Sequence, residues 1–588
     1  MDSVYMFRVF KVLFFFTTLA CIQQIKGQTL WINHAATLVD KQSNICYASV
    51  KKNIKDALHF SVPVLLEIRN PVGEGNVRAD SILVDNVKYK NGDVITVVAN
   101  MSKHELIYSI DSKQDTLYFV LTSLPILTIS KQDNSPFNLD TPVPTQFSVY
   151  DPYARTENLA FFSSFANVSL RGATASLMEK KSYKVKLADK NTNEDVDVNL
   201  FGIRKSENWI LDAAAIDYSR IRNRVCTDIW NRMSTLRDED MLRNGTQGLY
   251  CELMIDGAYQ GIYCLTDNIN RSLLGLKKVK DDDGNLQNAQ VRGILYKCKG
   301  NDYGPSKLKK EETPWTRYNT DVWYDWYLKY PNDIYDERSW QPLYDLIEHT
   351  DQLSAAPDSV KWLTDCFYYD NFVEYAVFAM SMRLLDNVMH NSYLSVKNRE
   401  KSFKVWITPW DMDGSFGRDG AAYIYDSPAY TFQVFGNTHP YRYYYDEQIQ
   451  PFYDDFVRLM KQLHADGGPL STDSVSSLID SYVDVLEQSG SWKRERERWD
   501  GIDNVWYHTP INLTETLAEE AAFMKKWYKM NETYLLEKSN ATSVGNVLNN
   551  IVQDTKNVYM LDGKKVNAPT INSMPRGIYI TNGKKFIR

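Results

Sequence analysis

The chain has 588 residues, more than one hydrophobic core holds, so several domains are expected. Hydrophobic residues make up 44% and charged residues 24%, which argues against both a disordered chain and a bundle of membrane helices. The formal net charge of −7 argues against a nucleic-acid-binding protein, because such proteins carry a basic surface.

The N-terminus has the pattern of a signal peptide. Arg8 and Lys11 accompany an apolar run at 12–20 that is too short to span a bilayer. We therefore expect residues 1–27 to be a cleaved leader, with lipidation of Cys21 as the alternative. No later run is apolar enough for a transmembrane helix. The expected location is outside the cell, secreted or at the cell surface in association with the outer membrane.

Six cysteines follow the leader, and none forms a Cys-x-x-C pair, so a zinc site is not expected. Export permits disulfides, but most of these cysteines lie in apolar stretches, which favours buried free thiols. They are Cys46, Cys226, Cys251, Cys264, Cys298 and Cys366.

Residues 28–122 carry short apolar runs separated by turns rich in Asn, Gly and Asp. The runs at 62–68, 94–98 and 117–121 have the composition of strands. Several short strands with such turns predict a β-sandwich. Nothing in this segment suggests catalysis, so we expect a spacer or adhesive module.

A second unit begins near residue 123, where two strand-like runs flank a turn of small residues at 172–176. In the second run, a period of two places three apolar side chains on one face and Lys184 and Lys186 on the other. A strand lysine that faces a nucleotide contacts its phosphates in kinases. The alternative is a solvated face.

A helix and a hairpin are predicted next. From Arg220 to Trp230, apolar residues recur at helical spacing. Asp256-Gly257, between two strand-like runs, is typical of a two-residue hairpin turn. The segment 313–340 is rich in Trp, Tyr and Asp, and we interpret it as an insertion that shapes a substrate surface.

The strongest chemical signal lies between Asp386 and Asp413. Asn391 is the fifth residue after Asp386, two strand-like runs follow as a hairpin, and Asp411 and Asp413 come directly afterwards. In protein kinases an Asp orients the hydroxyl, and an Asn and a later Asp bind magnesium in the same order. Magnesium prefers such carboxylate and amide oxygens. The alternative is that these residues cap turns around a buried strand pair.

Helical spacing surrounds this stretch and predicts an α-rich lobe. The helical segments are 365–385, 451–465, 472–488 and 515–537. Two strand-like pieces near the C-terminus, at 558–565 and 577–588, predict a small β tail.

Several motifs together resemble the CotH kinase family, which is similar to bacterial spore-coat protein H. They are Arg171-Gly172, the lysine-rich 180–186, Arg222-Asn223, Glu252 with its hairpin, and 409–413 followed by Phe416-Gly417. The motifs occur in the family's order between about residues 124 and 527. The resemblance implies an atypical protein-kinase-like domain within an α+β chain.

The resemblance also implies roles for the matching residues. Asp386 would be catalytic, Asp411 the main magnesium ligand, and Asn391 and Asp413 auxiliary ligands. The nucleotide contacts would come from Arg171, Lys181, Lys184, Lys186, Glu252 and Asp267. Asp267 stands where the family tends to have Glu. If this acid pairs with the phosphate-binding lysine, its shorter reach implies a weakened or absent kinase activity.

We therefore expect a β-sandwich at 28–122, a kinase-like domain at 123–540 and a β tail at 541–588. The tail is similar to C-terminal modules of exported Bacteroidetes proteins, some of which are sorting signals. The expected activity is transfer of phosphate from ATP, with Mg²⁺, to Ser or Thr hydroxyls of a co-exported or surface protein. The alternative is a catalytically inactive kinase fold that binds glycan or protein at the cell surface.

Overall fold

The computed structural model describes residues 29–33, 35–51, 61–69, 79, 81–98, 103–153, 160–234, 245–281, 284–298, 320–323, 326–352, 359–384, 387, 391–418, 424–425, 427–428, 450–505, 508–552, 558–560, 578–581 and 584–587. Helices and sheets are mixed along the chain, which confirms the α+β class. The expected leader, with Cys21, lies outside the described residues. Within them, no helix combines the length and the apolar character needed to cross a membrane.

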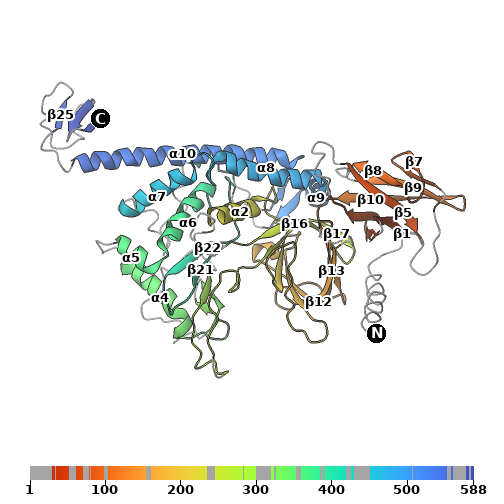
Figure 1. Ribbon diagram of the computed structural model, residues 1–588, viewed down its shortest axis with the longest axis horizontal. Helices are drawn as coiled ribbons and strands as arrows, with labels where there is room; N and C mark the ends of the chain where they lie inside the picture. Colours follow the sequence, from red (N-terminus) through yellow and green to blue (C-terminus); the bar gives the residue numbers. More distant parts are fainter. Residues whose placement is uncertain are drawn as a thin grey trace, which may run out of the picture.

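Two sheets form the N-terminal part of the molecule (Figure 1). The first contains, in spatial order, β2 (Ala35–Ala36), β1 (Thr29–Ile32), β5 (Ser61–Arg69) and β8 (Val94–Val98). The second contains β3 (Leu38–Asp40), β4 (Ile45–Ser49), β10 (Lys113–Thr122), β9 (His104–Ile110), β6 (Ser81–Val84) and β7 (Val87–Tyr89). Alternate side chains of both sheets, such as Leu66, Ile82 and Phe119, share one buried core, as in face-to-face sheet packing.

A closed barrel follows directly. Its strands, in spatial order, are β11 (Ile126–Lys131), β12 (Val143–Asp151), β13 (Ala160–Leu170), β14 (Tyr183–Ala188), β15 (Asn208–Asp212), β17 (Ala258–Asp267) and β16 (Gly248–Ile255). In β14, the apolar side chains are buried while Lys184 and Lys186 lie on the opposite face, as the period of two predicts. Asp256 and Gly257 form the turn between β16 and β17, which confirms the predicted hairpin.

The sandwich is docked on the β16–β17 turn of the barrel. The rings of Tyr47 and Tyr259 stack with their centres 4.9 Å apart. The backbone N–H of Lys41 donates to the carbonyl of Gly257 at 2.8 Å. A small apolar cluster that includes Leu38 and Met254 continues across the same junction.

A five-stranded sheet, called the second sheet below, lies beside the barrel and is separate from the two sheets of the sandwich. Its order is β19 (Val322–Trp323), β20 (Trp326–Tyr330), β18 (Ile294–Cys298), β21 (Ser392–Val396) and β22 (Val405–Pro409). The sequence pattern of 313–340 indicates a surface-shaping insertion, but its Trp323, Trp326 and Trp340 are fully buried in the main core, so these three side chains pack the fold.

Helices cover the rest of the kinase-like region, and α10 runs along one side of the molecule past α8, α6 and α7 (Figure 1). The helices are α2 (Arg222–Ser234), α4 (Glu337–Gln352), α5 (Ser359–Cys366), α6 (Tyr369–Met382), α7 (Gln450–Leu463), α8 (Thr472–Gln488), α9 (Ser491–Trp499) and α10 (Leu517–Val552). A short 3₁₀ turn, η2 (Thr174–Ser176), follows β13. Two small sheets complete the fold, namely β23 (Ile502–Asn504) with β24 (Thr509–Ile511), and β25 (Val558–Met560), β26 (Ile578–Thr581) and β27 (Lys584–Ile587).

The six described cysteines are free thiols, as expected from their apolar surroundings. Five are buried, and Cys366 is half-buried.

Candidate functional site

An acidic turn follows β22 and carries Asp411 and Asp413, both half-buried. The backbone N–H of Trp410 donates to the carbonyl of Asn391 at 3.0 Å, so the start of β21 and the acidic turn are tied together. Asp411 has a φ of 60°, a conformation that L-residues rarely adopt and that is common at functional sites. The backbone of Asn391, an expected metal ligand, thus lies next to the turn that carries Asp411 and Asp413.

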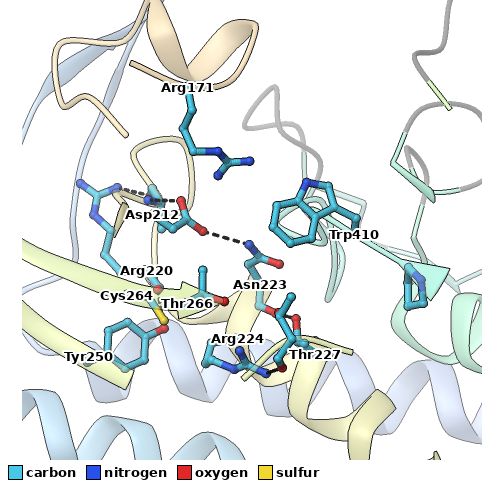
Figure 2. A pocket seen from close by; sticks show the side chains of 13 residues that line it. Arg171, Asp212, Arg220, Asn223, Arg224, Thr227, Tyr250, Cys264, Thr266 and Trp410 are labelled. Carbon is cyan, nitrogen blue, oxygen red and sulfur yellow. Dashed lines mark hydrogen bonds between the residues drawn. The ribbon is translucent and has the colours of Figure 1, made fainter. Parts of the chain in front are cut away.

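Asn223 of α2 holds this turn in position. Its Oδ1 accepts a hydrogen bond from the N–H of Met412 at 3.1 Å, and its Nδ2 donates to Oδ2 of Asp212 at 3.0 Å. Asp212 ends β15, so one side-chain amide links a barrel strand, a helix and the acidic turn (Figure 2). Asn223 belongs to the motif Arg222-Asn223, but no pattern in the sequence indicates this bridging contact.

The expected catalytic residue, Asp386, lies outside the described residues. Its neighbour Asn387 is buried, and its Nδ2 donates to the carbonyls of Trp410 at 2.8 Å and Asp411 at 3.3 Å. The hydroxyl of Tyr375 on α6 donates in turn to the carbonyl of Asn387 at 2.8 Å. Asn387 is therefore fixed against the turn that carries the expected metal ligands.

A pocket opens beside this turn, between the outer face of the barrel, α2 and the end of β22. Figure 2 shows the guanidinium of Arg171 pointing into the space between Asp212 and the ring of Trp410. The guanidinium carbon lies 5.3 Å from the centre of that ring, a cation–π contact. The other lining residues are Ala214, Arg220, Asn223, Arg224, Thr227, Thr246, Tyr250, Cys264, Thr266 and Pro409.

The side chains at the acidic turn fit magnesium. Asp411 and Asp413 offer carboxylates and Asn391 an amide, all of them hard oxygen donors. In the described part of the chain, no group of three or more His, Cys, Asp and Glu residues could hold a metal ion. Magnesium needs few protein ligands, because it keeps several waters and also binds substrate phosphates.

The three expected phosphate-binding lysines have different surroundings. Nζ of Lys181 donates to the carbonyl of Ser176 at 2.9 Å, and Lys186 forms a surface ion pair with Asp195 at 2.7 Å. Lys184 is exposed on the outer face of the barrel, and its charge acts on Lys329 of β20. Of the three, Lys184 is therefore the one directed toward the second sheet.

The buried lysine of segment 180–186 is Lys180, which is not among the expected nucleotide contacts. Its Nζ donates to Oε1 of Glu495 on α9 and to the carbonyl of Ile262, both at 2.6 Å. Glu495 also accepts hydrogen bonds from Nε of Arg220 at 2.9 Å and from the N–H of Ile262 at 2.8 Å. The side chains of Lys180 and Glu495 are completely buried, so this cluster fastens α9 to the barrel.

Glu252 and Asp267 bind arginines. Both oxygens of Glu252 accept hydrogen bonds from Arg494 at 2.9 Å. Asp267 accepts a hydrogen bond from Nε of Arg204 at 2.9 Å, and burial raises the pKa of its carboxyl group. The pairing of Asp267 with a phosphate-binding lysine, considered from the sequence, is replaced by this pairing with Arg204.

Lys297 of β18 is a further basic residue near the acidic turn. Its Nζ lies 5.9 Å from the ring centre of Tyr393. Burial lowers the pKa of Lys297, the charge of Asp411 raises it and that of Arg171 lowers it. One signal in the sequence could have identified it, because Lys297 is the charged residue within the otherwise apolar strand run 294–298.

A family model described as CotH kinase protein matches residues 168–535. The match covers more than half of the chain and contains the pocket, the acidic turn and α9. No curated protein matches this chain. The chain belongs to the CotH kinase protein family.

Proposed function

We propose that this protein is an exported atypical kinase that transfers phosphate from ATP to Ser or Thr hydroxyls of a protein, with Mg²⁺. One observation carries the proposal. In a chain of the CotH kinase family, Asn223, Asn387 and the backbone of Asn391 all hold the turn with Asp411 and Asp413 beside a pocket. Such positioning is what catalysis of phosphoryl transfer mostly requires.

Each residue of the proposed site has one task. Asp411 and Asp413, with the amide of Asn391, would hold Mg²⁺, which neutralises charge on the phosphates. Asp386 would orient the substrate hydroxyl and accept its proton. The hydroxyl oxygen forms a bond to the γ-phosphorus, the bond from that phosphorus to the bridging oxygen breaks, and ADP leaves.

The proposal includes where the protein acts. The apolar run at 12–20 supports a leader at 1–27, followed by a sandwich at 28–122, a kinase domain at 123–540 and a tail at 541–588. The tail would be a sorting module of the kind found in exported Bacteroidetes proteins. The substrate is then a co-exported or surface protein.

The test compares radiolabel transfer from ATP by the wild-type protein, Asp411→Asn and Asp386→Asn. Both variants should lose transfer because they remove a metal ligand or the hydroxyl-orienting group, while their melting temperatures stay at the wild-type value. Asp466→Asn, at an exposed position, is the matched control and should remain active. A wild-type protein with no transfer and no Mg²⁺-dependent ATP binding would overturn the proposal in favour of an inactive surface-binding fold.

A further inference from the structure

Four basic side chains gather where the barrel meets the second sheet, although the chain as a whole has a net charge of −7. They are Lys184 of β14, Arg171 after β13, Lys297 of β18 and Lys329 of β20. Two of them come from the barrel region and two from the second sheet. We call this group the junction cluster.

The strand registers place Lys184 and Lys297 at this junction. Lys184 lies opposite Ile210 in the pairing of β14 with β15. Ile210 packs in one apolar cluster with Leu295 and Tyr393 of the second sheet. Lys297 is two residues after Leu295, on the same face, and lies opposite Tyr393 in the pairing of β18 with β21.

Lys329 and Arg171 complete the cluster. Tyr327 pairs with Lys297, and Lys329 follows two residues later, where the pairing of β20 with β18 shifts register. The positive charge of Lys184 lowers the pKa of Lys329. The positive charges of Arg171 and Lys329 likewise lower the pKa of Lys297. The guanidinium of Arg171 lies beside the ring of Trp410 (Figure 2).

The cluster has an excess of positive charge. The negative charge of Asp411 raises the pKa of Lys297, and that of Asp321 raises the pKa of Lys329. Yet within the described residues none of the four basic side chains forms an ion pair with a carboxylate. Lys297 is half-buried, and burial is the largest cause that lowers its pKa, so its charged form is stabilised less by water here than on an open surface. A bound anion would compensate for this loss.

We propose that the junction cluster binds the polyphosphate chain of a nucleoside triphosphate, with Lys297 as its central contact. The inference rests on the proposed kinase function and assigns phosphate binding to a lysine of the second sheet together with Lys184. Linked phosphates carry several negative charges, which Lys binds as a point charge and Arg with two parallel hydrogen bonds. The partly buried setting between two layers strengthens these contacts. Phosphates held here lie next to Asp411.

The test measures binding of sodium tripolyphosphate to the intact chain by calorimetry, without divalent cations and without phosphoryl transfer. Lys297→Met should weaken binding about tenfold or more, as for loss of one charge-assisted contact, and Lys329→Met severalfold. Lys297→Arg should retain most of the affinity. Lys525→Met is the matched control, because Lys525 of α10 is already paired with Asp480 of α8, and it should bind like the wild-type protein.

Competition then identifies the source of the phosphates. ATP should displace tripolyphosphate, and adenosine should not. A wild-type protein that does not bind tripolyphosphate, a Lys297→Met protein with wild-type affinity, or a failure of ATP to compete would each overturn the inference. The result is independent of the transfer assay, because a protein that binds tripolyphosphate through Lys297 yet transfers no label contradicts the kinase proposal alone.

Discussion

At the scale of single residues, Asn223 connects the most parts of the site. Its amide oxygen and nitrogen are both used, one for the backbone of Met412 and one for Asp212. Met412 directly follows Asp411, whose backbone has a φ of 60°. Such a conformation is kept only where surrounding contacts stabilise it, and the hydrogen bond from Met412 to Asn223 is one of them. Asn223 is therefore a positioning residue in the proposed kinase site.

Asn223→Ala should lower the transfer rate by about tenfold to a hundredfold, because the metal ligands lose their fixed position. It should also raise the Mg²⁺ concentration needed for half-maximal rate, which a purely structural change would leave in place. The measurement is a Mg²⁺ titration of radiolabel transfer. Asn208→Ala, at the other end of β15, is the control and should leave both quantities as they are. An unchanged Mg²⁺ requirement in Asn223→Ala would contradict the positioning role.

Gly261 allows the barrel backbone to approach the buried carboxylate of Glu495. Its φ is +86°, and a Cβ atom added there would lie 2.2 Å from Oε2 of Glu495. We expect Gly261→Ala to lower the melting temperature markedly, because it combines a strained backbone with displacement of a buried carboxylate. Gly467→Ala separates the two causes, since Gly467 has a φ of +75° with nothing within 4 Å of the added atom. Equal melting temperatures for the two variants would show that Glu495 is not displaced.

At the scale of elements, α9 is held to the barrel by buried charges. Lys180 and Arg220 bind Glu495, and Arg494 of the same helix binds Glu252 of β16. Removal of Arg494 would leave the buried carboxylate of Glu252 uncompensated, which is strongly destabilising, whereas Glu495 keeps Arg220 when Lys180 is removed. The docking of α9 thus depends on keeping Arg494 paired with Glu252.

Arg494→Met should lower the free energy of unfolding by about 3–5 kcal/mol, because it leaves the buried carboxylate of Glu252 without its cation. Lys186→Met breaks a surface pair with Asp195 and should cost about 0–1 kcal/mol. Urea denaturation of both variants, followed by tryptophan fluorescence, checks the difference. Similar losses for the two variants would show that the buried cluster adds no more than a surface pair does.

Buried Lys180 predicts a pH dependence. Burial lowers the pKa of Lys180 from 10.5 to about 8. Between these values the unfolded chain binds more protons at this position than the folded chain does. Lys180 therefore makes the folded state more stable as the pH rises from 8 to 10.5, and less stable as the pH falls. The stability difference between wild type and Lys180→Met should therefore grow over this range. A constant difference in urea denaturation at pH 8 and pH 10 would contradict the lowered pKa.

At the scale of the whole molecule, buried thiols are spread over the sandwich, the barrel and the helices. Burial raises the pKa of Cys46 to about 11 and those of Cys226, Cys264 and Cys366 to about 12. The reactive thiolate form is therefore scarce at neutral pH. No disulfide joins the six described cysteines, so packing and hydrogen bonds hold the described layers together.

In a Cys21→Ser chain, the folded protein should react very slowly with a thiol reagent at pH 8, and six thiols should react after unfolding in denaturant without reductant. An absorbance assay of the released chromophore gives both numbers. Fewer than six thiols after unfolding would reveal a disulfide and contradict the free state of these cysteines. Rapid reaction of the folded protein would contradict their burial.

Much of the local structure was determined by the sequence alone. The period of two in β14, the Asp256-Gly257 turn and the helix at 472–488 were all predicted, because neighbours along the chain decide such features. The helix predicted at 365–385 is divided in the structure. α5 ends at Cys366, α6 begins at Tyr369, and Phe367 between them forms a bridge to Val405 of β22.

The pairing of charges was decided only by the tertiary structure. Glu495 lies 315 residues after Lys180, and no spacing along the chain connects the two. The same holds for Arg204 with Asp267, for Asn223 with Met412, and for Lys297 beside the acidic turn. Local periodicity tells which face of a strand a lysine occupies, but the packing of the barrel against the second sheet and α9 determines which acid, ring or anion that face meets.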